Sequence, residues 1–356
     1  MLARTQQPEP DWALIGQQYQ ADDVKGFTQV LTTLGPLAAL WYAVAPSAQV
    51  SLWLTAAVIL AMVLFLCRAF VLLHECGHGS LFRTARLNRA FGFVFGVVAG
   101  MPQFVWSKHH AYHHATNGNW AKYGGPLNTR SVDEFRAMTA RQQRRYERAR
   151  NIWLAPIAGF LYLIFNPRRT WLAGSLGFVA HALKRGVQGF KTPYWNDARE
   201  YWHMFWNNVV LLAAWAAMSL WIGPALFFFV YLTSVSLAGG VVIVLFSVQH
   251  NFEHSYASGD EGWDSHAAAI HGSSFLDLPR WLHWFTANIA YHHVHHLSAR
   301  IPNYRLVECH RRYQHLFSDV RRIGLLELHT AMKHILWDVR AGRIISVAEC
   351  RLLETK

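Results

Sequence analysis

The stretch that decides the fold is VSLWLTAAVILAMVLFLCRAFVLLHECGH, residues 50–78. It is almost wholly apolar to Cys67 and apolar again to Leu73, and it ends in His74-Glu-Cys-Gly-His78. A membrane-spanning helix needs roughly 20 apolar residues, and histidines four apart share one helical face. The stretch therefore predicts a spanning helix with a pair of metal-binding side chains at its end.

Three further apolar stretches accompany this one: Val30–Ala45, Phe205–Ile222 and Pro224–Val248. Hydrophobic residues make up 53% of the 356-residue chain, which also has 16 tryptophans. The four stretches, at about residues 30–45, 50–73, 205–222 and 224–248, pair into two helical hairpins through a bilayer. The alternative is a large soluble core with buried helices.

The charge distribution weighs against that alternative. No Lys or Arg lies between Gly26 and Cys67, nor between Glu200 and Pro279, and the two hairpin turns, Ala45–Gln49 and Gly223–Ala225, carry no charge. By the positive-inside rule the turns face away from the cytoplasm, while both termini and the histidine clusters face it. This topology accounts for the formal charge of +12, so no nucleic-acid partner is expected.

Shorter apolar stretches predict re-entrant or interfacial helices at Ala90–Trp106, Ile152–Phe165 and Trp171–Leu183. One of them could instead be a further span. The expected fold is an all-α integral membrane protein with four spans in two hairpins, interfacial helices and a cytoplasmic helical cap that holds the histidines. Its expected divisions are a cytoplasmic segment (1–29), the main domain (30–310) and a cytoplasmic helical tail (311–356).

Two more histidine clusters lie just outside apolar stretches: His109-His-Ala-Tyr-His-His114 and His292-His-Val-His-His296. Helical spacing places three members of each cluster on one face, whereas His109 and His293 point elsewhere. If the clusters meet, the expected ligands, including His250 at the end of the fourth span, are His74, His78, His110, His113, His114, His250, His292, His295 and His296. This number exceeds what one ion accepts and implies two metals.

The remaining histidines are weaker candidates. Structural rather than ligand roles are expected for His181, His203, His310, His315, His329 and His334. Roles in or around the metal shell stay open for His254, His266, His271 and His283. By ligand type alone the metal could be zinc or copper. The residues expected to orient the imidazoles are Glu75, Glu253, Asp264, Asp277 and Asn117.

At these residues the chain resembles the membrane fatty acid desaturase superfamily, and most strongly the bacterial acyl-lipid desaturases. The family pattern is HxxxH, HxxHH and a second HxxHH. Matching motifs include His74-Glu-Cys-Gly-His-Gly-Ser80, Val248-Gln-His-Asn-Phe-Glu253 and His292-His-Val-His-His-Leu-Ser-Ala-Arg-Ile-Pro-Asn-Tyr304. The similarity runs from about Ala61 to His310.

The resemblance implies a di-iron centre held by the nine histidines, and O2-dependent desaturation of a membrane lipid's acyl chain.

 By the same resemblance iron is the metal, dioxygen is the co-substrate, and two hydrogens leave adjacent methylenes. It places the chain in a bacterial inner membrane. Family relatives of the animal stearoyl type have an Asn where this chain has Phe246, so a tenth contact is in doubt, and Gln249 could replace it only by another route.

An alkyl chain has no polar handle, so an apolar tunnel must select the carbon that nears the metal. Trp106, Phe104 and Trp284, which lie beside the clusters, are candidates for its lining, with core packing as the alternative role.

Electrons must come from a separate donor, such as a ferredoxin or a cytochrome. The chain has no His-Pro-Gly-Gly haem motif, no dinucleotide fingerprint and no CxxC pair. Such donors are commonly acidic, so the basic residues Arg141, Arg144 and Arg145 are a candidate docking patch. The alternative is a solvated helix that obeys the positive-inside rule.

Rival functions remain. A hydroxylase of alkyl, sterol or carotenoid substrates shares the first hydrogen abstraction, so the histidine clusters cannot separate it from a desaturase. A metal transporter or a bis-histidine haem carrier would need its ligands inside the spans, and here the histidines gather at one end. The oxidised carbon, the chain length, the acyl carrier, the donor's identity and the oligomeric state stay open.

Overall fold

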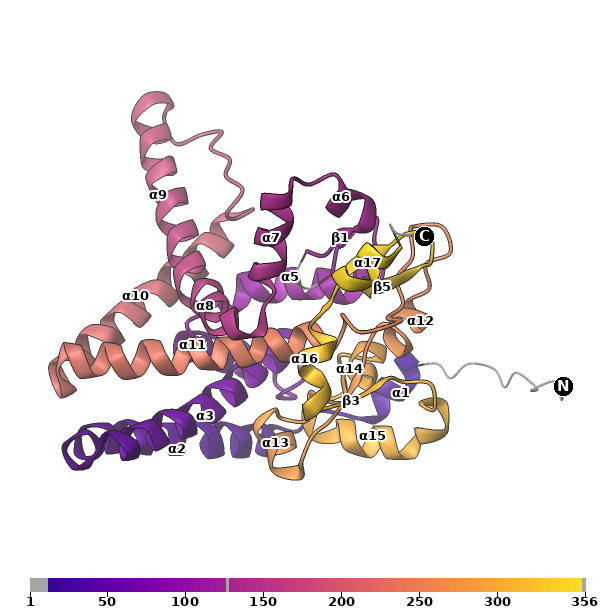
Figure 1. Ribbon diagram of the computed structural model, residues 1–356. Helices are drawn as coiled ribbons and strands as arrows, with labels where there is room; N and C mark the ends of the chain where they lie inside the picture. Colours follow the sequence, from indigo (N-terminus) through magenta and orange to yellow (C-terminus); the bar gives the residue numbers. More distant parts are fainter. Residues whose placement is uncertain (1–11, 126–127, 354–356) are drawn as a thin grey trace, which may run out of the picture.

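Two long helical hairpins form one end of the molecule (Figure 1). The computed structural model describes residues 12–125 and 128–353. In this part of the chain, four helices are long and apolar enough to cross a membrane: α2 (Asp23–Val50), α3 (Leu52–His78), α10 (Ala198–Ile222) and α11 (Pro224–Val248). The prediction of four spans in two hairpins is confirmed.

The first hairpin turns later than the sequence predicts. Residues 45–49, expected to form the turn, belong to α2, which contains Pro36 and Pro46 and continues to Val50. Proline is tolerated in membrane helices because neighbouring groups can satisfy the freed carbonyl. The chain reverses at Ser51, whose side chain caps α3 by accepting a hydrogen bond from the Leu54 amide at 3.1 Å.

The bends between the shorter helices also differ from expectation. The Ala90–Trp106 stretch is two helices, α4 (Ala85–Ala99) and α5 (Gln103–Thr116), which meet at 100°. The break falls at Gly100, whose φ of +75° favours glycine, and at Pro102, which precedes α5. The bend directs α5, with its histidines, away from the line of α4.

The other two short stretches are helical, as predicted. The chain runs through a 3-10 turn, η1 (Ile152–Leu154), then α8 (Ala155–Phe160), the π-helical segment η2 (Leu161–Phe165) and α9 (Asn166–Arg185). Helix α8 lies directly against α11 because both helices have glycine, which has no side chain, where they cross. A Cβ atom on Gly159 would lie 2.4 Å from the Gly239 carbonyl carbon.

A cap of short elements lies at the end of the molecule opposite the hairpin tips (Figure 1). Its helices are α1 (Trp12–Gln18), α6 (Val132–Arg136), α7 (Ala140–Ala149), α12 (Ser265–Ile270), α13 (Arg280–Phe285), α14 (His292–Leu297), α15 (Leu306–Arg312), α16 (Leu328–Ala331) and α17 (Val347–Leu352). Its 3-10 turns are η3 (Asn303–Arg305), η4 (Gln314–Leu316) and η5 (Leu325–Glu327).

Small sheets join distant parts of this cap. In one sheet, β4 (His334–Asp338) lies between β1 (Arg130–Ser131), which is parallel to it, and β5 (Arg343–Ser346), which is antiparallel. In the other, β2 (Phe275–Asp277) pairs in parallel with β3 (Arg322–Gly324).

The tail after residue 310 is therefore not the helical segment that the sequence analysis predicted. Three of the five strands in the described residues lie there, and β3 and β4 pair with strands from earlier parts of the chain. The physical reason is tertiary packing: Ile335 and Leu336 on β4 and Ile345 on β5 are buried in one apolar cluster with Val132 and Phe135. Branched apolar residues in short runs favour strands that cover a core.

The crossing of α8 and α11 yields a stability prediction. Gly239→Ala should lower the free energy of unfolding by about 1–3 kcal/mol, because its Cβ would meet Gly159 Cα at 2.7 Å and backbone cannot move aside cheaply. Gly35→Ala in α2 is the matched control, since nothing lies within 4 Å of its Cβ position. Thermal unfolding in detergent measures both, and equal melting temperatures for the two variants would contradict the close approach.

Candidate metal centre

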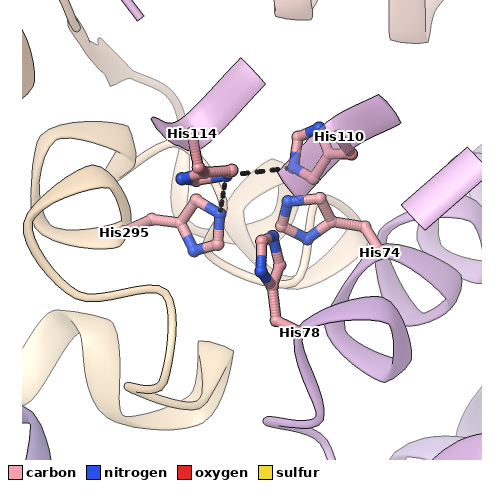
Figure 2. Close-up of side chains that lie close together, drawn as sticks. All are labelled: His74, His78, His110, His114 and His295. Atoms are coloured by element: carbon pink, nitrogen blue, oxygen red, sulfur yellow. Dashed lines mark hydrogen bonds between the residues drawn. The ribbon is translucent and has the colours of Figure 1, made fainter. Parts of the chain in front are cut away.

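The three histidine clusters meet where the ends of α3, α5 and α14 come together. Five imidazoles form a first group, in which one nitrogen from each ring lies within 4.8 Å of the others: His74, His78, His110, His114 and His295. Figure 2 shows these rings turned toward a common centre. Their burial is partial or complete, so water competes little for the nitrogens.

A second group lies beside the first and consists of His113, His250, His292 and His296. The second and third clusters are each divided between the two groups. His110 and His114, four residues apart on α5, enter the first group, and His113 turns to the second. The structure thus brings all nine predicted histidines together, in two sets, as the expectation of two ions demands. Their role as ligands stays a prediction.

The contacts within each group suit a cation better than hydrogen bonds among the rings. His114 Nε2 lies 3.0 Å from His110 Nε2 and 3.1 Å from His295 Nε2. One ring nitrogen carries at most one proton, so it cannot satisfy several converging lone pairs. The Nε2 atoms of His74 and His78 are buried without any hydrogen-bond partner. Buried orphans are costly, and a bound metal ion would pair them all.

Burial keeps the imidazoles of both groups in the neutral form that can bind a metal ion. Burial, reinforced by the neighbouring histidines, lowers the pKa of His295 and of His296 far below the ordinary histidine value. The same causes lower the pKa of His113. These imidazoles are therefore neutral at physiological pH, and the neutral ring is the form that coordinates metals.

One carboxylate orients a ring of the first group. Glu75 is fully buried, and its Oε1 lies 3.2 Å from His74 Nδ1. Its Oε2 accepts hydrogen bonds of 2.9 Å from the Ser80 hydroxyl and from the Asn303 amide. In the second group, His250 Nδ1 lies 2.9 Å from the Gly272 carbonyl oxygen. Such contacts hold the ring orientation that directs the other nitrogen to a metal.

Comparison with known proteins agrees with this geometry. The family described as "Fatty acid desaturase" matches residues 51–323. The "Fatty acid desaturase" of Bacillus subtilis (strain 168) is 34% identical over 298 residues, which cover 83% of this chain and 79% of the relative. The chain belongs to the fatty acid desaturase family. Desaturases are oxidoreductases.

More distant relatives come from cyanobacteria. The "sn-1 oleoyl-lipid 12-desaturase" of Picosynechococcus sp. (strain ATCC 27264 / PCC 7002 / PR-6) is 25% identical over 249 residues, and that of Anabaena variabilis is 23% identical over 249 residues. Each match covers 67% of this desaturase and 62% of the relative, so the chain spans less than two thirds of their length.

The other histidines of the desaturase lie outside both groups, as far as the described residues show. His293 turns away as predicted, and its Nε2 lies 2.9 Å from His310 Nδ1. His109 is exposed. Neither group includes His181, His203, His310, His315, His329 or His334, nor the four that stayed open, His254, His266, His271 and His283.

Four of the five residues predicted to orient the imidazoles do not do so. In the described chain, no hydrogen bond or ion pair joins Glu253, Asp264 or Asp277 to the nine histidines. Glu253 lies 3.7 Å from the exposed His254, and Asp264 caps α12. Asn117 donates its hydrogen bond to the Ala268 carbonyl at 3.1 Å. The prediction relied on closeness in sequence, but Glu253, Asp264 and Asp277 are exposed, and the Asn117 amide bonds to α12.

A polar network behind Glu75 was missed altogether. The Asn303 and Gln29 side-chain amides exchange two hydrogen bonds, of 2.8 and 2.9 Å. Gln29 in turn accepts from the buried Arg68 guanidinium at 3.2 Å, which also donates to the Trp284 carbonyl. The signal was in the sequence, because Arg68 is the only Lys or Arg within α3. A buried charge in an apolar helix requires partners.

An apolar cavity of about 250 Å³ adjoins both groups and is bordered by His74 and His110 of the first and by His113 and His292 of the second. Of the three aromatic residues proposed for a tunnel, only Trp106 lines it. Its ring stacks on His110 at 4.6 Å, and its indole NH donates to the Tyr162 hydroxyl at 2.7 Å.

The other two candidates pack elsewhere. The Arg68 guanidinium carbon lies 3.9 Å from the centroid of the Trp284 ring. The ring centroids of Phe104 and His203 are 5.4 Å apart. Phe246 and Gln249 both line the cavity. Gln249 donates to the Ile289 carbonyl at 2.9 Å, so its amide nitrogen is engaged away from the histidines.

The contact between Glu75 and His74 can be tested by metal retention. Glu75→Ala should weaken metal binding by about 10–100-fold, because His74 loses the acceptor that orients it. Glu253→Ala, which changes an exposed carboxylate outside both groups, should retain the metal. Elemental analysis after dialysis against a graded series of chelator concentrations measures both. Equal retention by the two variants would contradict the orienting role.

Proposed function

We propose that this chain is an O2-dependent acyl-lipid desaturase, in which the two histidine groups hold two iron ions. The observation that carries the proposal is the convergence of nine imidazoles, four of which line an apolar cavity. Bound iron would supply the activation of dioxygen and the removal of hydrogen from an unactivated alkyl chain. The names of the cyanobacterial relatives, which act on an oleoyl-lipid, support a lipid-bound acyl chain as the substrate.

The residues around the cavity would bind the alkyl chain and position it. The cavity walls, among them Phe70, Val242 and Ile243, offer an alkyl chain apolar contact and keep water away from the reacting methylenes. Trp106 is held by its stacking on His110 and by the Tyr162 hydroxyl, so it presents a rigid surface beside the first histidine group. Such a rigid wall can hold one pair of methylenes near the centre.

The proposed orientation places the metal centre and both chain ends on the cytoplasmic side of a bacterial inner membrane. Its support is the charge distribution: the turns of both hairpins lack Lys and Arg, and His74, His78 and His250 lie at or just past the opposite ends of α3 and α11. A soluble donor on the cytoplasmic side, such as a ferredoxin or a cytochrome, would then reach the cap.

The first test is a fatty-acid profile. A bacterial host that expresses the chain should accumulate a new unsaturated fatty acid, and His295→Ala should abolish it by removing a ligand of the five-histidine group. His329→Ala, an exposed histidine outside both groups, is the matched control and should keep the product. Gas chromatography–mass spectrometry with double-bond mapping gives the position. A hydroxylated acid would favour the hydroxylase, and an unchanged profile would contradict desaturation in that host.

The donor patch gives a second test. Arg141, Arg144 and Arg145 are exposed on α7. Reversing all three to Glu should slow reduction by an acidic ferredoxin about tenfold or more at low salt, because docking loses electrostatic steering. The matched control reverses Arg83, Arg86 and Arg89, which are exposed near the start of α4 and change the net charge equally. Stopped-flow reduction measures both, and equal rates would show that α7 is only a solvated basic helix.

A further inference from the structure

A second cavity, of about 150 Å³, reaches the metal centre and shares no lining residue with the apolar one. It is bordered by His114 of the first group and His296 of the second. These two rings stack on each other with centroids 4.2 Å apart and planes 17° from parallel. The cavity therefore meets the centre at the boundary between its two halves.

The lining of this cavity is more polar than that of the other, although Trp12, Trp263 and Leu297 also belong to it. Besides the two imidazoles it includes Asn117, Ser265 and His266. Ser265 is exposed, whereas Ala268 and Ala269 on the same helix are buried, so the cavity runs from the surface inward. A polar space of this size has room for several waters.

The wall of the cavity is fastened to the metal-binding helix. Asn117 directly follows α5, and its side-chain amide donates to the Ala268 carbonyl of α12 at 3.1 Å. The Trp263 indole NH donates to the Asn117 carbonyl at 2.9 Å. Asn117 thus joins α12 to the end of α5, the helix that carries His114.

The chemistry requires such a polar route. Desaturation converts R–CH2–CH2–R′ with O2, two electrons from a one-electron donor and two protons into R–CH=CH–R′ and two waters. Two of the four hydrogens in the water come from the substrate and two from solvent. The apolar cavity suits an alkyl chain, but protons and water cross apolar space poorly.

We propose that the polar cavity between α5, α12 and α14 is the port through which solvent protons reach the metal centre and product water leaves it. This inference rests on the proposed function, since it assumes a metal centre that forms water. Small hydrophilic molecules and the alkyl chain then use separate openings.

Azide, a small hydrophilic anion that absorbs visibly when bound to ferric iron, is the probe. Ala269→Phe should fill the polar cavity and slow azide binding to the oxidised protein by about tenfold or more, since a space that holds only several waters is readily obstructed. Ser265→Phe, at the exposed rim, is a second variant that leaves the packed core untouched. Ile243→Phe, which narrows the apolar cavity, is the matched control and should bind azide at the wild-type rate.

A measurement on the wild-type protein needs no substitution. Dipalmitoyl phosphatidylglycerol is added to the oxidised protein, where it is not converted because no reductant is present. Its acyl chain should occupy the apolar cavity and leave the rate of azide binding unchanged. The port would be overturned if both iron-loaded variants, Ala269→Phe and Ser265→Phe, bound azide at the wild-type rate. It would also be overturned if the lipid or Ile243→Phe blocked azide binding. Iron content is measured separately, and a wild-type protein without iron would refute the proposed function instead.

Discussion

The rest of the structure depends on holding nine neutral imidazoles with their lone pairs facing one another inside the protein. Such a set is unfavourable without a cation, because one nitrogen cannot donate to several neighbours. His114, which lies close to both His110 and His295, shows the conflict directly. The fold resolves the problem by rigidity: the histidines come from the ends of long packed helices and from short helices fastened to them. The orphaned nitrogens are the feature that a metal would complete.

Helix α3 connects the membrane to this centre. It is largely buried along its second half and carries His74 and His78 at its last turn. The network from Arg68 through Gln29 and Asn303 to Glu75 joins α3 to α2 and to the loop after α14. A charge buried in an apolar helix is costly unless paired. We therefore interpret this network as one that positions Glu75, and through it His74, rather than as a source of stability.

The centre lies between two spaces of opposite character. Of the nine grouped histidines, the apolar cavity touches four, and the polar cavity touches two others, one from each group. This division matches a reaction that joins an alkyl chain to solvent-derived protons. Asn117 has a structural role beside the polar cavity, because its side chain joins the end of α5 to α12.

The sequence by itself determined the spans and the set of converging histidines, because both depend on local periodicity: long apolar runs make spanning helices, and spacings of three and four place side chains on one face. Only the tertiary structure decided which histidines share a group, because that depends on how α5 and α14 lie against α3. It also decided that Glu75 contacts a histidine while Glu253 does not, and that the tail forms strands. Strand pairing of residues 322–346 with segments far back in the chain is non-local, so no local pattern could reveal it.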